Sequence, residues 1–259
     1  MRIALVQLDI RWEDPETNRL RAERRVREAA AAGAELVVLP EMFNTGFSMD
    51  AGRLAEPSDG ATTRWIKETA TGLGVHLVAG LPSLPGPENH AVWCTPTGDL
   101  QRYSKLHPFS LAGEDQHYRA GTRIEHWVIA GVRVTPFICY DLRFPEAFRA
   151  ASDDTDLYLV IANWPERRRA HWQTLLRARA IENLAWVAGV NRCGDGGGLH
   201  YAGDSALISP WGETVLSAAE TETVLVADVD PAAVAEARRS FPVLADRRPE
   251  LRAPGRVSP

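Results

Sequence analysis

The chain has few cysteines and lacks any long apolar run. Its 259 residues contain three cysteines, and none belongs to a CxxC pair, which argues against a disulfide framework or a zinc site. Cys94 and Cys193 are interpreted as packing residues. No stretch approaches the roughly 18 apolar residues of a membrane helix, and the first predicted strand begins at Arg2, which leaves no room for a signal peptide. We therefore expect a cytoplasmic protein without membrane contact.

Clustered positive charge is scarce as well. The formal net charge is −5, and the one basic block is Arg167–Arg169, interpreted as a solvated helix start or an interface edge, so nucleic-acid binding is disfavoured. No GK[ST] follows the glycine-rich segment 194–198, which is therefore predicted to be a flexible loop that can edge a pocket, not a phosphate loop. His90, His107 and His200 lack the spacing of metal ligands and are read as structural or pocket-lining residues. We expect no metal and no cofactor.

Strands and helices are predicted to alternate along the chain, and 45% of its residues are hydrophobic and available for a core. Predicted strands cover 3–9, 35–39, 75–81, 89–95, 100–104, 125–130, 132–139, 157–162, 186–191, 205–209, 213–217 and 223–229. Predicted helices cover 14–32, 63–71, 146–151, 170–183 and 231–240. The second half begins near Glu125 and repeats the scheme of the first. Because each sheet must be covered on both faces, this pattern predicts an α/β protein.

One domain is predicted over residues 1–246. The segment that follows, 247–259, holds four arginines and three prolines but little apolar material. It is predicted to be either a disordered tail or an arm that folds across a partner subunit, and the sequence alone does not choose between the two.

Three chemically useful side chains follow predicted strands. Cys139 ends the apolar run 132–138 where the chain turns toward a helix, and free backbone N–H groups and a helix end are expected to lower its thiol pKa from the reference of about 8.5. Glu41 and Lys105 each follow a further predicted strand. Ligands of open α/β sheets bind just beyond the carboxyl ends of strands. Each residue alone fits a packing or surface role, but together they predict a site.

These residues and their surroundings resemble the nitrilase superfamily of carbon–nitrogen hydrolases, whose catalytic residues are Glu, Lys and Cys in this order. The matching residues are Glu41 in Leu-Pro-Glu-Met-Phe, Lys105 in Tyr-Ser-Lys-Leu-His-Pro-Phe and Cys139 in Cys-Tyr-Asp-Leu-Arg-Phe-Pro-Glu. The similarity continues through 162–165, 177–183 and 203–205 to about residue 229, and the chain looks most like the ω-amidase-like branch of small amidases. The resemblance implies a four-layer α-β-β-α sandwich with two pseudo-symmetric halves. We also expect a homodimer or a higher homo-oligomer.

The resemblance and the chemistry of the residues predict nucleophilic catalysis on an amide. Cys139 would attack the carbonyl carbon. Glu41 would take the thiol proton, pass it to the departing ammonia and later activate water against the thioester; burial must raise its pKa from about 4.3 for this work near neutrality. Lys105 and the backbone N–H of Tyr140 would stabilise the oxyanion. Glu114 is predicted to support the lysine and the substrate, as a second glutamate does in the superfamily, whereas the alternative is a solvated loop acid.

The implied substrate is a small amide, such as the dicarboxylate monoamides 2-oxoglutaramate or succinamate. Its far carboxylate needs a cation, and Arg143 is the candidate because it lies four residues after Cys139 and guanidinium binds carboxylate bidentately. The alternative fits the sequence equally well: Arg143 forms an ion pair with Asp141 or Glu146 and only stabilises the turn. Three further residues are predicted to line the substrate pocket: Phe43, Asn163 and Trp164.

Other functions remain compatible with parts of the pattern. A nitrilase or an N-carbamoyl or N-acyl amidohydrolase would use the same three residues on another small substrate. An acyl-transferring or catalytically inactive interaction protein could share the fold, but the complete Glu–Lys–Cys set argues against an inactive protein. A papain-like protease would pair its cysteine with a histidine base, and no signature of that kind is present.

Overall fold

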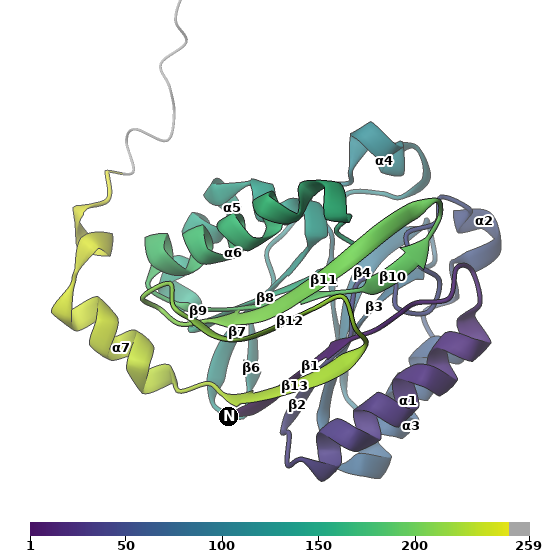
Figure 1. Ribbon diagram of the computed structural model, residues 1–259, viewed down its shortest axis with the longest axis horizontal. Helices are drawn as coiled ribbons and strands as arrows, with labels where there is room; N and C mark the ends of the chain where they lie inside the picture. Colours follow the sequence, from purple (N-terminus) through teal and green to yellow (C-terminus); the bar gives the residue numbers. More distant parts are fainter. Residues whose placement is uncertain (249–259) are drawn as a thin grey trace, which may run out of the picture.

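The computed structural model describes residues 1–248, in which two β-sheets pack face to face with helices on both outer sides (Figure 1). The first sheet has the order β13-β1-β2-β3-β4-β5. Its strands are β1 (Arg2–Gln7), β2 (Leu36–Val38), β3 (His76–Ser83), β4 (Glu88–Cys94), β5 (Leu100–Ser104) and β13 (Thr223–Asp228). The second sheet has the order β10-β11-β9-β8-β7-β6, and β12 pairs with β11. Its strands are β6 (Trp127–Ile129), β7 (Val132–Ile138), β8 (Leu157–Ala162), β9 (Trp186–Asn191), β10 (Cys193–Gly196), β11 (Leu199–Ile208) and β12 (Thr214–Ala219).

Helices cover the outer face of each sheet. The α-helices are α1 (Pro15–Ala31), α2 (Ala51–Leu54), α3 (Ala61–Leu73), α4 (Glu114–His117), α5 (Pro145–Ala150), α6 (Arg169–Asn183) and α7 (Pro231–Ser240). Helix α1 begins as predicted, because the side chain of Asp14 caps it by accepting from the N–H of Thr17 and Pro15 occupies its first turn. Helices α1 and α3 lie on the first sheet, and α5 and α6 lie on the second (Figure 1).

Side-chain alternation along the strands explains the layers. In β1, Ile3 and Leu5 belong to the core between the two sheets, whereas Ala4 and Val6 pack with side chains of α1 and α3. Successive strand residues point to opposite faces, so a strand that is apolar throughout must be covered on both sides. The predicted four-layer α-β-β-α sandwich is confirmed.

The two sheets repeat one pairing scheme. Strands β1, β2 and β3 are parallel, as are β7, β8 and β9, and antiparallel strands flank each set on both sides. The halves are not contiguous in the chain, because β13 returns from the predicted second half to pair with β1. The backbone N–H of Val229 donates to the carbonyl of Met1 (2.8 Å) where this pairing ends.

The local structure differs from the prediction in two places. The predicted flexible loop 194–198 is part of an ordered hairpin in which β10 pairs with β11, and Gly197 and Gly198 form its turn with φ of +55° and +76°, conformations that favour glycine. The short helices α2 and α4 were not predicted. Of the predicted tail 247–259, Arg247 forms an ion pair with Asp153 (2.7 Å), and the part from residue 249 onward lies outside the described residues.

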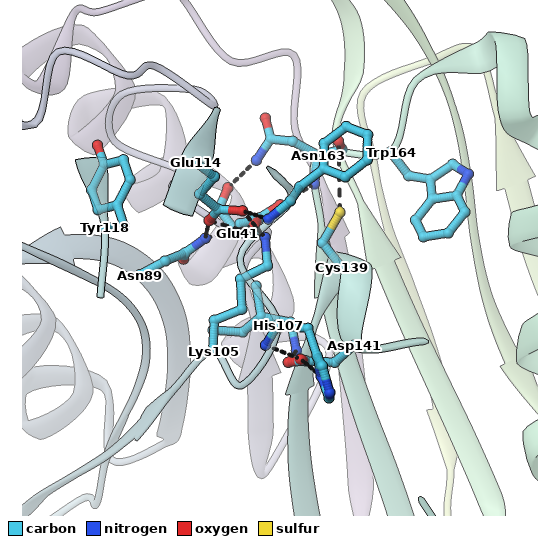
Figure 2. Close-up of polar contacts among 12 residues, drawn as sticks. Glu41, Asn89, Lys105, His107, Glu114, Tyr118, Cys139, Asp141, Asn163 and Trp164 are labelled. Carbon is cyan, nitrogen blue, oxygen red and sulfur yellow. Dashed lines mark hydrogen bonds and ion pairs between the residues drawn. The ribbon is translucent and has the colours of Figure 1, made fainter. Parts of the chain in front are cut away.

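The fold brings the ends of several strands to one place. Glu41 follows β2, Lys105 follows β5 and Cys139 follows β7, so the sheets deliver the three side chains from different segments to a common region (Figure 2). Among the helices within residues 1–248, none is long and apolar enough to cross a membrane.

Gly80 on β3 gives a first prediction. A Cβ atom at this position would lie 2.4 Å from Cα of Glu41 and 2.7 Å from the backbone nitrogen of Met42, so the turn that carries Glu41 must move. We expect Gly80→Ala to lower the free energy of unfolding by about 1–3 kcal/mol and to reduce any activity that depends on Glu41. Urea denaturation measures the first effect.

Gly72 in α3 is the matched control, because a Cβ there meets nothing within 4 Å. Gly72→Ala should leave stability unchanged or raise it by up to about 1 kcal/mol. Equal stability of the two variants would show that the turn at Glu41 does not need this close approach.

Candidate active site

Cys139 lies at the turn where β7 passes into a 3-10 helix, Cys139–Arg143. Its φ of +46° is in the left-handed region, which costs a non-glycine residue roughly 1–3 kcal/mol and persists only where the surroundings impose it. Strain of this kind is frequent at functional sites. The Sγ atom lies 3.9 Å from the carbonyl oxygen of Asn163, beside the group formed by Glu41 and Lys105 (Figure 2).

Lys105 is buried between two carboxylates. Its Nζ atom donates to Oε1 of Glu41 (2.9 Å) and to both oxygens of Glu114 (3.1 and 2.8 Å), and all three side chains are at most 1% exposed. Asn89 ties the carboxylates together, since its Nδ2 donates to Oε1 of Glu41 (2.7 Å) and Oε1 of Glu114 (2.9 Å). The backbone N–H of Asn163 donates to the other oxygen of Glu41 (2.7 Å). Every charged atom of this group therefore has a partner.

The charges in this group shift one another's pKa. Burial alone would lower the pKa of Lys105, but Glu114 and Glu41 outweigh it and the net shift is upward, so the side chain is an ammonium ion at all physiological pH values. Burial raises the pKa of Glu114, while Lys105 acts in the opposite direction. The sequence pointed to Glu114 through resemblance only; its 0% exposure and its contact with Lys105 rule out the solvated loop acid.

The thiol of Cys139 departs from the expectation of a lowered pKa. Burial raises its pKa well above the ordinary value, the carboxylate of Glu41 raises it further, and Lys105 only partly compensates. Two carboxylates and one ammonium leave the neighbourhood with a negative charge, which disfavours a thiolate. The prediction was wrong because it counted the backbone N–H groups and the helix end but not the buried acids. In the free protein the nucleophile candidate is a thiol.

Asp141 connects the Cys139 turn to the Lys105 loop. Its fully buried carboxylate accepts hydrogen bonds from the backbone N–H of Ile138 (3.0 Å), the hydroxyl of Tyr103 (2.7 Å) and the backbone N–H of His107 (2.9 Å), and its Oδ1 lies 2.8 Å from Nδ1 of His107. Tyr103 and His107 flank the lysine in sequence, two residues on either side. One carboxylate thus fixes the turn and the loop relative to each other (Figure 2).

A pocket opens above Cys139. Its lining is aromatic and cationic: Phe47, Phe109, Ala112, Cys139, Tyr140, Arg143, Asn163, Trp164, Pro165, Arg167, Arg168, Leu199 and Tyr201. Three of the predicted substrate residues, Arg143, Asn163 and Trp164, are among them, as is Tyr140. Strand β11, which follows the glycine-rich segment 194–198, contributes Leu199 and Tyr201, whereas no residue of the segment itself is among the lining residues.

Of the two predicted substrate-binding residues Phe43 and Arg143, only Arg143 lines the pocket. Phe43 does not line the pocket: it is fully buried in the core under α3, with its ring 5.3 Å from that of Trp65, and Phe47 takes the place predicted for it. The two ion pairs considered for Arg143 do not form within residues 1–248. Instead its guanidinium lies 4.7 Å from the ring centroid of Trp164, and Nη2 lies 3.1 Å from Nδ1 of His171.

Several residues of the site were missed by the sequence. Asn89 is a buried amide near the start of β4, and a residue of low strand propensity at the start of a predicted strand was the available signal. Asp141 was considered only as a partner of Arg143. Arg168 was read as solvated surface, whereas it is half-buried at the pocket. Nothing in the local pattern distinguished Tyr201 or Phe47 from core residues.

Comparison with known proteins now identifies the family. Residues 2–239 match the carbon–nitrogen hydrolase family. The chain belongs to the carbon–nitrogen hydrolases. Relatives of this hydrolase include the ω-amidase YafV of Escherichia coli strain K12, 40% identical over 253 residues that cover 95% of this chain and 96% of YafV. The 2-oxoglutaramate amidase of Bacillus subtilis strain 168 is 35% identical over 257 residues, covering 96% of this chain and 98% of the relative.

Solved structures place this carbon–nitrogen hydrolase in the nitrilase-like fold. XC1258 from Xanthomonas campestris, a CN-hydrolase superfamily protein with an arsenic adduct in its active site, superposes with a TM-score of 0.92 at 42% identity, covering 96% of this chain and 97% of that one. A mutant amidase from Nesterenkonia sp. AN1 superposes with a TM-score of 0.86 at 28% identity, covering 97% and 98% of the chains. That structure shows the result of Michael addition of acrylamide at the active site cysteine.

The raised pKa of Cys139 predicts how the free enzyme reacts with iodoacetamide. Only the thiolate is alkylated, and a raised pKa means that the thiolate is the minor form at neutral pH and grows with pH. We expect the alkylation rate at Cys139, followed by peptide mass spectrometry, to rise about tenfold per pH unit from about pH 7 to 9 without a plateau. The other thiols should react slowly, because Cys94 and Cys193 are 0% and 1% exposed and do not line the pocket, whereas Cys139 does.

The Glu41→Gln variant supplies the matched control. It removes the negative charge that raises the thiol pKa and keeps the positive charge of Lys105, so its alkylation profile should shift to lower pH. A wild-type plateau below about pH 8, or an unshifted profile in the variant, would contradict the electrostatic account of the site.

Proposed function

We propose that this carbon–nitrogen hydrolase is an ω-amidase, which releases ammonia from a small amide that carries a carboxylate at its far end. The observation that carries the proposal is the pocket above Cys139. Arg143, which forms no ion pair within residues 1–248, lines the same pocket as the thiol, and the buried ammonium–carboxylate group lies beside that thiol. The names of the two relatives, ω-amidase and 2-oxoglutaramate amidase, support the same substrate class.

In the proposed mechanism Glu41 and Cys139 act as one unit. The sulfur attacks the amide carbon while Glu41 accepts the thiol proton, and the tetrahedral intermediate collapses when the same proton passes to the leaving ammonia. Glu41 then removes a proton from water, which attacks the thioester and releases the carboxylic acid and the free thiol. Because the thiol starts protonated, a base in contact with it is required, and the raised pKa of Cys139 favours return of its proton at the end.

Lys105 supplies positive charge to the oxyanion in this mechanism. Its ammonium is fixed by two carboxylates before substrate binds, so stabilising the developing charge requires little reorganisation. The backbone N–H of Tyr140 is the second donor that we assign to the oxyanion. We assign Glu114 a supporting role, since it holds Lys105 in place and compensates its charge but is not assigned a proton transfer.

Arg143 is assigned to the far carboxylate of the substrate. Its guanidinium lies over the ring of Trp164, 4.7 Å from the centroid, and within residues 1–248 no carboxylate forms an ion pair with it. A planar guanidinium binds a carboxylate through two parallel hydrogen bonds. Asn163 and Trp164 would complete the wall of the pocket. A nitrilase or an N-carbamoyl or N-acyl amidohydrolase remains the alternative, and substrate assays separate it from an ω-amidase.

We also propose that the enzyme works in the cytoplasm as a homo-oligomer. Its three cysteines are free, as suits a reducing compartment. Trp211 and Phe241 are about half exposed, and their rings stack on the surface with centroids 6.2 Å apart. Large exposed apolar side chains that gather in this way are typical of protein contacts.

An assay of ammonia release tests the proposed function. We expect wild-type protein to hydrolyse succinamate or 2-oxoglutaramate, and the folded Cys139→Ala variant to retain less than about 1% of this activity. Stopping the reaction with acid should trap an acyl adduct that maps to Cys139 and not to Cys94 or Cys193. Activity of the variant above a few per cent would exclude Cys139 as the nucleophile.

The role of Arg143 is tested by comparing substrates across one substitution. Arg143→Met removes the cation but keeps an apolar chain against Trp164. We expect kcat/KM to fall about 10- to 100-fold on succinamate and less than about threefold on butyramide, which has no carboxylate. Equal losses on both substrates would assign Arg143 to structure. Absence of activity on every carboxylated amide would reject the ω-amidase but leave the thiol mechanism in place.

A further inference from the structure

A second guanidinium faces the pocket from another wall. Arg143 lies on Trp164, whereas the guanidinium of Arg168 lies 5.2 Å from the ring centroid of Phe109. Both arginines line the pocket above Cys139, and both are half-buried. Among the described residues three arginines line the pocket: Arg167 is exposed, whereas Arg143 and Arg168 each lie over an aromatic ring.

Arg168 has no carboxylate to neutralise it among residues 1–248. After burial, which lowers the pKa of Arg168, the largest effects on that pKa come from Arg167, Cys139, Arg143 and Tyr201, none of which carries a fixed negative charge. The next arginine in the sequence shows the contrast, since Arg169 forms ion pairs with Asp204 (2.6 Å) and Glu220 (3.0 Å). In a protein whose net charge is −5, leaving Arg168 half-buried and unpaired beside Arg143 is unfavourable unless an anionic ligand joins them.

The position of Arg168 is fixed by the same residues that build the site. Its carbonyl oxygen accepts from Nε1 of Trp164 (2.8 Å), the ring that carries Arg143. Its side chain reaches across to Phe109, whose backbone N–H donates to the carboxylate of Glu114. Both cations are therefore held relative to the Lys105 group by hydrogen-bonded neighbours, which gives the pair a defined geometry.

One carboxylate does not need two arginines. Its two oxygens are satisfied by a single guanidinium in the bidentate arrangement, and Arg143 is assigned to that contact. A 2-oxo acid offers a third acceptor, the keto oxygen, next to the carboxylate. A charged donor forms a stronger hydrogen bond to a keto oxygen than a neutral donor does, and a second guanidinium is such a donor.

We propose that Arg168 determines specificity by donating to the 2-oxo group of the substrate, so that Arg143 and Arg168 together select amides of 2-oxo dicarboxylic acids over amides of plain dicarboxylic acids. This inference rests on the proposed function and adds a residue to it. Arg168 binds substrate and takes no part in the proton transfers.

The test compares 2-oxoglutaramate with glutaramate, which has the same length and differs only in the 2-oxo group. Wild-type kcat/KM should be higher on 2-oxoglutaramate. Arg168→Met should lower it about 10- to 100-fold on that substrate, mainly through KM, and less than about threefold on glutaramate. Arg168→Lys keeps the charge but not the planar donor pair and should recover part of the preference.

Arg64→Met is the control for loss of one positive charge. Arg64 lies on α3, donates to the carbonyl of Asp59 and does not line the pocket. Arg64→Met should therefore leave kcat/KM unchanged on both substrates. If Arg168→Met lowers kcat/KM by the same factor on both substrates, Arg168 contributes only a nonspecific electrostatic attraction, and the inference is wrong. If the wild type hydrolyses uncharged amides but neither carboxylated one, the proposed function itself fails.

Inhibition by the product acids measures binding to the pocket without any catalytic turnover of the inhibitor. The acids 2-oxoglutarate and glutarate carry no amide nitrogen. Neither acid is therefore hydrolysed by the enzyme, and neither can form a ring through an amide nitrogen. In the wild type, 2-oxoglutarate should inhibit succinamate hydrolysis more tightly than glutarate does, and Arg168→Met should abolish the difference while Arg64→Met keeps it. A preference for 2-oxoglutarate that survives Arg168→Met would overturn the inference.

Discussion

An ammonium ion without access to water lies between two carboxylates at the centre of this molecule. Glu41 lies 64 residues before Lys105 in the chain and Glu114 lies 9 residues after it, and all three side chains are buried. Breaking such a group by removing one partner leaves an uncompensated charge, which typically costs about 3–5 kcal/mol. The ends of β2 and β5 and the start of α4 are therefore held together by charge as well as by packing, and the precise position of the lysine follows from this constraint.

The same group decides the state of the nucleophile candidate. Burial raises the pKa of Cys139, and the carboxylates of Glu41 and Glu114 raise it further, so the acids that stabilise the lysine also favour the protonated thiol. In the proposed mechanism, because the thiol is protonated, the general base Glu41 must lie in contact with the nucleophile Cys139. The left-handed backbone of Cys139 aims the sulfur at that group, and Asp141, through Ile138 and His107, keeps the turn and the lysine loop in register.

Recognition and chemistry are divided between two sides of the site. The buried side holds Glu41, the ammonium of Lys105 and Asn89, and the amide nitrogen of Asn89 donates to the carboxylates of both Glu41 and Glu114. The open side holds aromatic rings with arginines resting on them. Stacking on a ring orients a guanidinium without neutralising its charge, so an anionic ligand finds donors that are already positioned. In the proposed ω-amidase, binding of the far end of the substrate thus fixes its amide against the sulfur.

The sequence by itself determined the local structure and the identity of the central residues. Alternating apolar strands and capped helices depend on neighbours in the chain, and the order of Glu41, Lys105 and Cys139 at strand ends carried the family resemblance. Tertiary structure alone decided what depends on neighbours distant in sequence. It put β13 beside β1, moved Phe43 into the core, ordered the glycine-rich hairpin and left Arg143 and Arg168 without an ion pair among residues 1–248. It also reversed the expected pKa shift of Cys139, because burial and the distances between charges in space set that shift, and a sequence specifies neither.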